Sequence, residues 1–237
     1  MFWNVDSVEG KDYAQVWELL ERMLVEYEID VLLLAESWPG EITDFYPVLP
    51  GNFSNRVRFF FRQTINLELF NDSIDNHHQS VVLQASGFDP IILTGVHFSI
   101  MRLSKDKRYA KFRVYAEELN RLREYAPNLL KNQQYQSEEK IKHLIFGDFN
   151  LNPWDNGMIE RDGFNAVSSE YIAKNNKRLG KYGSSNKIEY LYNPCWRLLG
   201  DRSRSGESVI PGTYKFTPKD IGEVHWNTID QVLLTRS

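Results

Sequence analysis

The stretch 144-LIFGDFNLNP-153 decides how this sequence is read. Its first three residues are apolar and predict a short buried strand, which we expect to stop at Gly147. Asn152-Pro153 then predicts a turn. Because side chains alternate along a strand, Asp148 and Asn150 are expected on the same side, where an acceptor and a donor converge. The alternative interpretation is an Asx-rich turn that caps the strand.

The composition is that of a globular protein with one large core. The chain has 237 residues, of which 42% are hydrophobic and 25% are charged. A formal net charge of −4 excludes a generally basic nucleic-acid coat but not a local basic patch. The single cysteine, Cys195, excludes an internal disulfide framework, and we interpret it as a packed residue. We expect no membrane span, no signal peptide and a cytoplasmic location.

Hydrophobic periodicity predicts a mixed order of strands and helices. A strand over 1–6, an amphipathic helix over 11–28 and a buried strand over 29–35 imply a parallel strand pair. A second, long helix is expected from Lys105 to Tyr125, with Pro127 ending it. Further strands are predicted at 57–61, 65–70, 81–86, 91–99, 213–216 and 228–234, with short helical pieces and loops over 154–212. The pattern predicts an α/β protein in which two packed sheets have helices outside.

Polar residues interrupt or end these predicted apolar strands. Burying such a group costs on the order of several kcal/mol unless it is paired or binds a metal. Their recurrence at strand edges predicts one shared site at a rim of the sheets, made of Asn4, Glu36, His97, Asp148, Asn150 and Asp230. Carboxylates and amides without cysteine suit Mg²⁺ or Mn²⁺ and suit zinc poorly. A divalent ion beside an imidazole is the equipment for hydrolysing a phosphate ester.

The motifs at these positions resemble the endonuclease/exonuclease/phosphatase family of DNase I-like nucleases, exonuclease III-like repair enzymes and sphingomyelinase-like phosphodiesterases. The matching stretches run through nearly the whole chain, at 3-WNV-5, 35-AES-37, 95-GVHF-98, 147-GDFN-150 and 227-NTIDQV-232. The resemblance implies a single domain over residues 1–237 with a four-layered α/β/β/α sandwich. It also implies a phosphoric ester hydrolase that depends on Mg²⁺ or Mn²⁺.

The resemblance implies a role for each residue of the predicted site. Glu36 resembles the principal metal-ligating glutamate, and Asn4 resembles the asparagine beside that metal. Asp148 resembles the aspartate that orients the attacking water, with a possible share in a second metal. Asn150 resembles the amide that holds the phosphate and the developing charge.

Two further positions separate this chain from other branches of the family. His97 matches the histidine of the DNase-like and sphingomyelinase-like branches, so the chain leans away from abasic-site repair. Asp230 resembles the aspartate that orients a final histidine in a Ser-Asp-His segment. That segment does not occur after Asp230, and His225 precedes it. We expect the chain to be truncated at the C-terminus, the alternative being a degenerate domain.

Basic residues gather in two places, at the start of the second helix and between 174 and 204. We expect Lys177, Arg178 and Lys181 to follow a nucleic-acid backbone, the alternative being a solvated charged face. His77 and His78 fall in the polar loop 71–80 and are expected to be solvated.

The function predicted on these grounds is a metal-dependent nuclease that cleaves nucleic-acid phosphodiester bonds. One alternative is a phosphatase or phosphodiesterase acting on a lipid or inositol phosphate. The other is a non-catalytic domain that binds nucleic acid or a partner protein.

Overall fold

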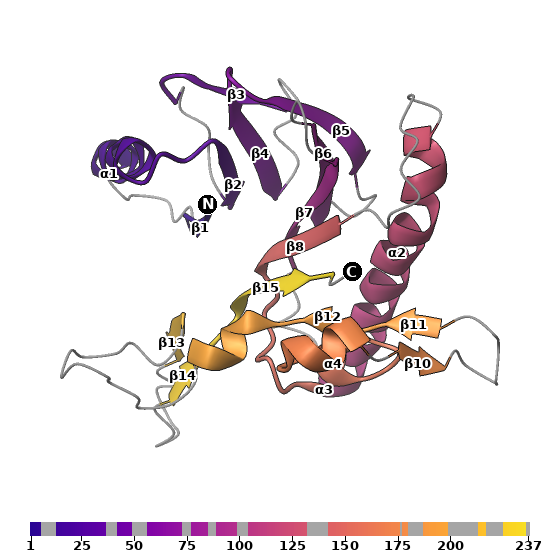
Figure 1. Ribbon diagram of the computed structural model, residues 1–237. Helices are drawn as coiled ribbons and strands as arrows, with labels where there is room; N and C mark the ends of the chain where they lie inside the picture. The colour runs from indigo at the N-terminus through magenta and orange to yellow at the C-terminus, as the bar shows by residue number, and fades with distance from the viewer. Residues whose placement is uncertain are drawn as a thin grey trace. The chain divides into compact units, whose positions relative to one another are not determined.

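The computed structural model describes residues 1–5, 13–36, 42–48, 56–72, 77–84, 89–98, 104–131, 142–175, 177–179, 187–198, 213–216 and 225–235 (Figure 1). The chain divides into two compact units. The first unit contains Met1–Phe98 and Ile145–Asp148, and the second contains Ser99–Leu144 and Phe149–Ser237. The single domain expected over residues 1–237 stays a prediction.

Two sheets make up the first unit. One has the strand order β1-β2-β4-β3. Its strands are β1 (Phe2–Asn4), β2 (Val31–Ala35), β4 (Val57–Arg62) and β3 (Phe45–Pro47). β1 and β2 are parallel, as predicted, and helix α1 (Tyr13–Glu26) connects them. The other sheet runs in the order β5-β6-β7-β8, with β5 (Asn66–Asp72), β6 (His78–Gln84), β7 (Ile91–His97) and the last four residues of β8 (Lys142–Asp148).

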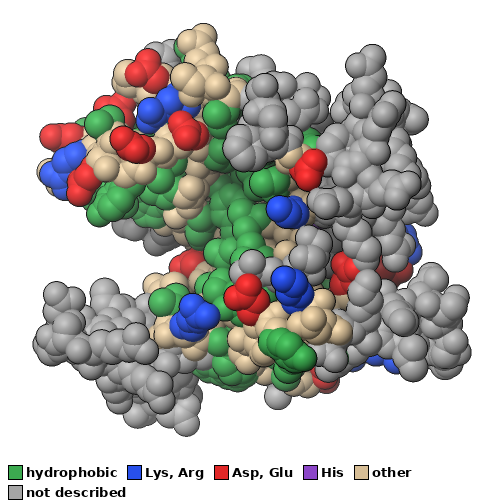
Figure 2. Space-filling view, viewed as in Figure 1, with side chains coloured by type: hydrophobic (Ala, Val, Ile, Leu, Met, Phe, Trp, Pro, Cys, Tyr) green, Lys and Arg blue, Asp and Glu red, His purple; other side chains and the backbone are tan. Residues whose placement is uncertain are grey.

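Strand β2 is buried on both faces, which explains its unbroken apolar sequence. Leu32 and Leu34 pack in one cluster with Leu20 and Leu24 of α1. Full burial of each such leucine stabilises the fold by about 1.5–3 kcal/mol. The outer side of α1 is solvated, and Figure 2 shows acidic and basic side chains gathered over this helix.

The opposite face of this first sheet meets the second sheet. Leu33 points to the face opposite Leu32 and Leu34 because side chains alternate along the strand. A Cβ added at Gly95 of β7 would lie 2.4 Å from a methyl carbon of Leu33, so the glycine makes room for that side chain. Phe59 of β4 also packs edge-on against Phe146 of β8, with ring centroids 5.9 Å apart. The two sheets of this unit therefore share one core.

The second unit combines the long helix α2 (Lys105–Lys131) with short elements. These are α3 (Asn156–Ile159), β9 (Ala166–Val167), α4 (Glu170–Asn175), β10 (Lys177–Leu179), β11 (Lys187–Glu189), β12 (Leu191–Tyr192), the 3₁₀ helix η2 (Pro194–Leu198), β13 (Tyr214–Phe216), β14 (His225–Asn227) and β15 (Asp230–Leu234). β12 lies between β9 and β15. Thr235, just after β15, bonds through its main-chain N–H to the carbonyl of His143 at 3.0 Å. The core of the second unit contains three buried aromatic rings that pack edge-on, those of Phe112, Phe149 and Phe164.

Two predicted element ends were wrong at residues that usually interrupt regular structure, a glycine and a proline. Strand β8 does not stop at Gly147 but runs to Asp148, with Gly147 at φ 140°. A Cβ at Gly147 would lie 2.1 Å from the carbonyl oxygen of Val96, so the glycine permits a close approach to β7 rather than a strand end. Helix α2 continues beyond Pro127 to Lys131. Proline removes one helical N–H donor, and the helix ends about one turn later.

None of the described helices is both long and apolar enough to cross a membrane.

Candidate metal and phosphoester site

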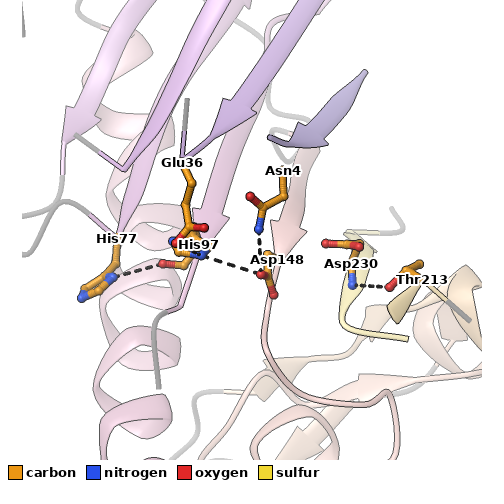
Figure 3. Close-up of polar contacts among 7 residues, drawn as sticks. All are labelled: Asn4, Glu36, His77, His97, Asp148, Thr213 and Asp230. Atoms are coloured by element: carbon orange, nitrogen blue, oxygen red, sulfur yellow. Dashed lines mark hydrogen bonds and ion pairs between the residues drawn. The ribbon is translucent and has the colours of Figure 1, made fainter. Parts of the chain in front are cut away.

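Four of the predicted site residues lie together at strand ends of the first unit (Figure 3). Asn4 ends β1 and Glu36 directly follows β2. These strands are parallel neighbours in which Asn4 pairs with Ala35, so both chains emerge at the same edge. His97 ends β7 and Asp148 ends β8. The main-chain N–H of Phe98 donates to the carbonyl of Asp148 at 2.9 Å, which holds those two ends together.

The side chains of these residues converge on the imidazole of His97. Its Nε2 atom lies 3.3 Å from Oε1 of Glu36 and 3.7 Å from Oδ2 of Asp148. Nδ2 of Asn4 donates to the same Asp148 oxygen at 3.3 Å. His97 and Asp148 are buried, whereas the Glu36 side chain keeps 35% of its exposure. Two carboxyl groups therefore meet around one imidazole, and Glu36 provides the side open to solvent.

Glu36 is held in an unusual main-chain conformation. Its φ of 51° lies in the left-handed region, which costs a residue with a Cβ about 1–2 kcal/mol. Its N–H donates to the carbonyl of Arg56 at 3.0 Å, which helps to retain that conformation. Strain of this kind clusters at functional sites.

The imidazole of His97 is neutral near neutral pH. Burial is the largest cause that lowers its pKa, the positive charge of Arg56 and then His77 add to the effect, and the pKa falls to about 4. Its contacts with Glu36 and Asp148 are therefore those of a neutral ring, which carries one N–H donor and one nitrogen acceptor.

The sequence did not identify Arg56 as a neighbour of the site, and the prediction for His77 and His78 was wrong. Arg56 is exposed and places positive charge near His97, but no pattern in the sequence singled it out. His77 and His78 were expected to be solvated, and this prediction was wrong because both are buried. β6 begins at His78, so the strand-forming run 81–84 extends three residues further back than its apolar residues indicated.

Asn150 and Asp230 belong to the second unit. Asn150 follows β8 with φ 52°, so the two-residue alternation expected from Asp148 does not extend to it. Asp230 begins β15 beside Thr213, whose hydroxyl oxygen accepts the N–H groups of Ile229 and Asp230, each at 3.1 Å. The hydroxyl proton of Thr213 then remains for the Asp230 carboxyl group. Burial raises the pKa of Asp230, and the Thr213 hydrogen bond partly offsets that rise.

The predicted nucleic-acid contacts are described only in part. Lys177 and Arg178 lie in β10, where they pair with Glu189 and Ile188 of β11. Lys181 lies outside the described residues. Cys195 is buried, as expected for a packed residue, and burial raises the pKa of its thiol.

The donors around His97 fit a hard divalent cation. Among the described residues, no three His, Cys, Asp or Glu side chains form a ready-made metal-binding group. Mg²⁺ needs no such group, because proteins usually hold it through one or two carboxylates while it retains several waters. Glu36 and Asp148 provide two carboxyl groups, and Asn4 provides an amide oxygen. These are the ligand types that Mg²⁺ and Mn²⁺ prefer.

Known structures of the same fold match the whole chain. A structure of D. rerio TDP2 complexed with single strand DNA product aligns with a TM-score of 0.57 and 14% identity, covering 100% of this chain and 82% of that one. A humanized D. rerio TDP2 gives a TM-score of 0.57, 13% identity and the same coverage. An endonuclease/exonuclease/phosphatase family protein from Bacteroides thetaiotaomicron gives 0.52 and 11%, covering 99% and 79%. These similarities confirm the predicted DNase I-like α/β sandwich class.

The sequence itself identifies the family. No curated protein matches the chain. The model of the Endonuclease/Exonuclease/phosphatase family matches residues 1–237. The chain therefore belongs to the Endonuclease/Exonuclease/phosphatase family, a family of phosphoric ester hydrolases.

Proposed function

We propose that the protein is a Mg²⁺- or Mn²⁺-dependent phosphodiesterase that cleaves nucleic acid at the Glu36–His97–Asp148 centre. The observation that carries the proposal is the convergence of two carboxyl groups on Nε2 of His97, at 3.3 and 3.7 Å. Neighbouring carboxylates repel each other, and a bound cation relieves that repulsion. Family membership supports phosphoric ester hydrolysis as the reaction class.

Glu36, Asp148 and Asn4 are the residues that would hold the ion. Such an ion neutralises phosphate charge and makes bound water more acidic. Glu36 offers its carboxyl group from the solvent-exposed side of the centre. Asn4 fixes one oxygen of Asp148 through its Nδ2–H group, which leaves the Asp148 carboxyl group oriented to hold water. In this scheme Asp148 aligns the attacking water and Glu36 is the principal ligand.

His97 acts as a neutral imidazole beside the phosphate. With a pKa near 4 its ring carries no charge at neutral pH, so it does not compete with the cation for the two carboxyl groups. A neutral ring can donate a hydrogen bond from its N–H group to a phosphate oxygen. We assign Asn150 to the phosphate and Asp230 to the orientation of a histidine, as the family resemblance implies.

Nucleic acid is the proposed substrate because of the basic residues between 174 and 204 and because a protein of the same fold has been seen with single strand DNA product. Lys177→Glu, Arg178→Glu and Lys181→Glu together should weaken binding to every sequence and reduce its salt dependence. An affinity for nucleic acid that changes neither with salt concentration nor with these three substitutions would favour a small phosphoester as the substrate.

The test is cleavage of labelled single- and double-stranded DNA and RNA with and without Mg²⁺, beside a small aryl phosphodiester. We expect nucleic acid to be cut only with the metal, and Asp148→Asn to lower kcat by about 10²–10⁴-fold. Glu160→Gln is the matched control, because Glu160 pairs with Arg113 on the surface of the second unit. Cleavage of the aryl phosphodiester without cleavage of any nucleic acid would identify a small phosphoester as the substrate class. Equal cleavage rates for Asp148→Asn and Glu160→Gln would show that the Glu36–His97–Asp148 centre is not the catalytic site.

A further inference from the structure

We propose that His77 is a positioning residue whose side chain fixes the main chain of His97 and so places Nε2 of His97 between Glu36 and Asp148. The expected effect of His77 on kcat rests on the function proposed above, whereas its effect on the position of the His97 ring can be measured independently.

Two hydrogen bonds join His77 to the main chain of His97. The N–H of His97 donates to the carbonyl of His77 at 2.8 Å. In return, Nδ1 of His77 lies 3.0 Å from the carbonyl oxygen of His97 (Figure 3). Both residues are buried, with exposures of 7% for His77 and 3% for His97. The His97 main chain is therefore held through both its N–H and its carbonyl group.

This pair lies where the β6–β7 ladder ends. His78 pairs with Val96 in the antiparallel register, so His77 is the residue opposite His97. Strand ends open more readily than strand centres because fewer bonds hold them. A side chain that adds a buried hydrogen bond at this position stiffens the point from which the His97 imidazole projects.

The bond defines the tautomer of His77. A carbonyl oxygen can only accept, so Nδ1 must carry the proton, and Nε2 of a neutral His77 is then an acceptor. Asparagine carries its amide nitrogen at the same position along the side chain as Nδ1. Glutamine carries it one bond further out, and phenylalanine has a similar shape without a donor. These three residues separate the hydrogen bond from the volume of the ring.

Small displacements of His97 matter because its imidazole contacts two groups at once. Nε2 lies 3.3 Å from Glu36 and 3.7 Å from Asp148, so a strand end that moves outward lengthens both contacts. Residues that orient catalytic or metal-binding side chains typically contribute about 10–100-fold in activity or affinity. The effect should appear in kcat, because the substrate does not touch His77 in this scheme.

The experiment compares His77→Asn, His77→Gln and His77→Phe with a control on the same strand pair. Ser80→Ala is that control, since it removes the buried 2.7 Å hydrogen bond between the hydroxyl groups of Ser80 and Thr94 and leaves the contacts of His97 in place. We expect His77→Phe and His77→Gln to lose about 10–100-fold in kcat with KM nearly unchanged. His77→Asn should recover most of that loss, and Ser80→Ala should lose stability but keep its kcat.

Imidazole NMR of protein labelled at histidine gives the second measurement, together with a melting curve for each variant. His97 ring signals should shift in His77→Phe, return towards their original positions in His77→Asn and stay unchanged in Ser80→Ala. Unmoved His97 signals in His77→Phe, or a His77→Asn variant no better than His77→Phe, overturns the role of His77. A wild-type protein without phosphodiesterase activity would instead reject the proposed function, and the NMR comparison would still decide on His77.

Discussion

Replacing Gly147 by alanine should force strands β7 and β8 apart beside the residues that carry the proposed chemistry. The new Cβ would lie 2.1 Å from the carbonyl oxygen of Val96, whereas carbon–oxygen contacts normally begin near about 3.3 Å. Gly147 also has φ 140°, a region that residues with a Cβ rarely adopt. Both obstacles lie in the main chain, so side-chain rotation relieves neither of them.

The size of the effect follows from these two terms. Main-chain strain contributes about 1–3 kcal/mol, and overpacking contributes about 1–3 kcal/mol more. We therefore expect Gly147→Ala to reduce the free energy of unfolding by about 2–6 kcal/mol. This is a large part of the total free energy of unfolding of a typical domain, which is about 5–15 kcal/mol. Relieving the overlap requires a shift of roughly 1 Å. A misplacement of that size between Asp148 and His97 can cost about 10²-fold in rate.

Gly95→Ala is the matched control, because its obstacle is a side chain. The Cβ at Gly95 would lie 2.4 and 2.6 Å from the two terminal carbons of Leu33. In a Leu33→Ala background that obstacle is gone, and the new methyl group fills part of the cavity. Gly95→Ala and Leu33→Ala should therefore show a coupling energy of about 0.5–3 kcal/mol in a double-mutant cycle. Gly147→Ala should show none with Leu33→Ala.

Urea unfolding followed by circular dichroism gives the stabilities, and cleavage rates give the effect on the site. A Gly147→Ala variant within about 0.5 kcal/mol of wild type, the usual range for harmless surface changes, would refute this reasoning. So would a Gly147→Ala penalty that Leu33→Ala relieves as well as it relieves that of Gly95→Ala.

Two further predictions concern carboxyl groups whose present state is unfavourable for stability. Burial raises the folded-state pKa of Asp230 above 3.8, so its ionised form costs stability that grows as pH rises through the folded pKa. Asp230→Asn should raise the melting temperature at pH 7 and lower turnover, and its difference in melting temperature from the wild type should become smaller towards pH 4. An unchanged or lowered melting temperature of Asp230→Asn at pH 7 contradicts this prediction. Glu36→Asn should be more stable than Glu36→Gln in the absence of metal by up to about 1 kcal/mol, because asparagine tolerates the left-handed φ of 51° better. Equal unfolding free energies for the two variants would show that Glu36 stores no such strain.

The sequence predicted the longer strands because their apolar runs are separated by polar turns. It missed the two- and three-residue strands β3, β9, β10, β11, β12 and β14, whose patterns are too short to indicate a strand. β2 illustrates this, since Leu32 to Ala35 are buried on both faces and the run could hardly be anything but a central strand. The gathering of Asn4, Glu36, His97 and Asp148 followed from their places at strand ends. Parallel pairing of β1 and β2 brings the first two to one edge, as the strand–helix–strand pattern predicted.

Tertiary packing decided the features that the sequence did not reveal. His77 looked like a loop residue because its neighbours are polar, yet its ring is buried against the carbonyl of His97. Gly147 looked like a strand end because glycine is a turn residue, yet β7 approaches too closely there for any Cβ. Arg56 acquires its significance only because its carbonyl binds Glu36 and its charge lies near His97. None of these three roles has a local signal in the sequence.

Glu36 and Asp148 are proposed to hold a divalent cation beside His97. Titration of Mn²⁺ into protein labelled at its five histidines, followed by imidazole NMR, tests this most directly, because Mn²⁺ broadens signals steeply with proximity. His143 is the internal reference, since it lies five positions before Asp148 in β8, about 17 Å along the strand.

We predict that His97 signals broaden first, that Mg²⁺ restores them by competition, and that Glu36→Gln removes the selective broadening. Uniform broadening of His97 and His143, or selective broadening that survives in Glu36→Gln, would contradict the proposed metal site.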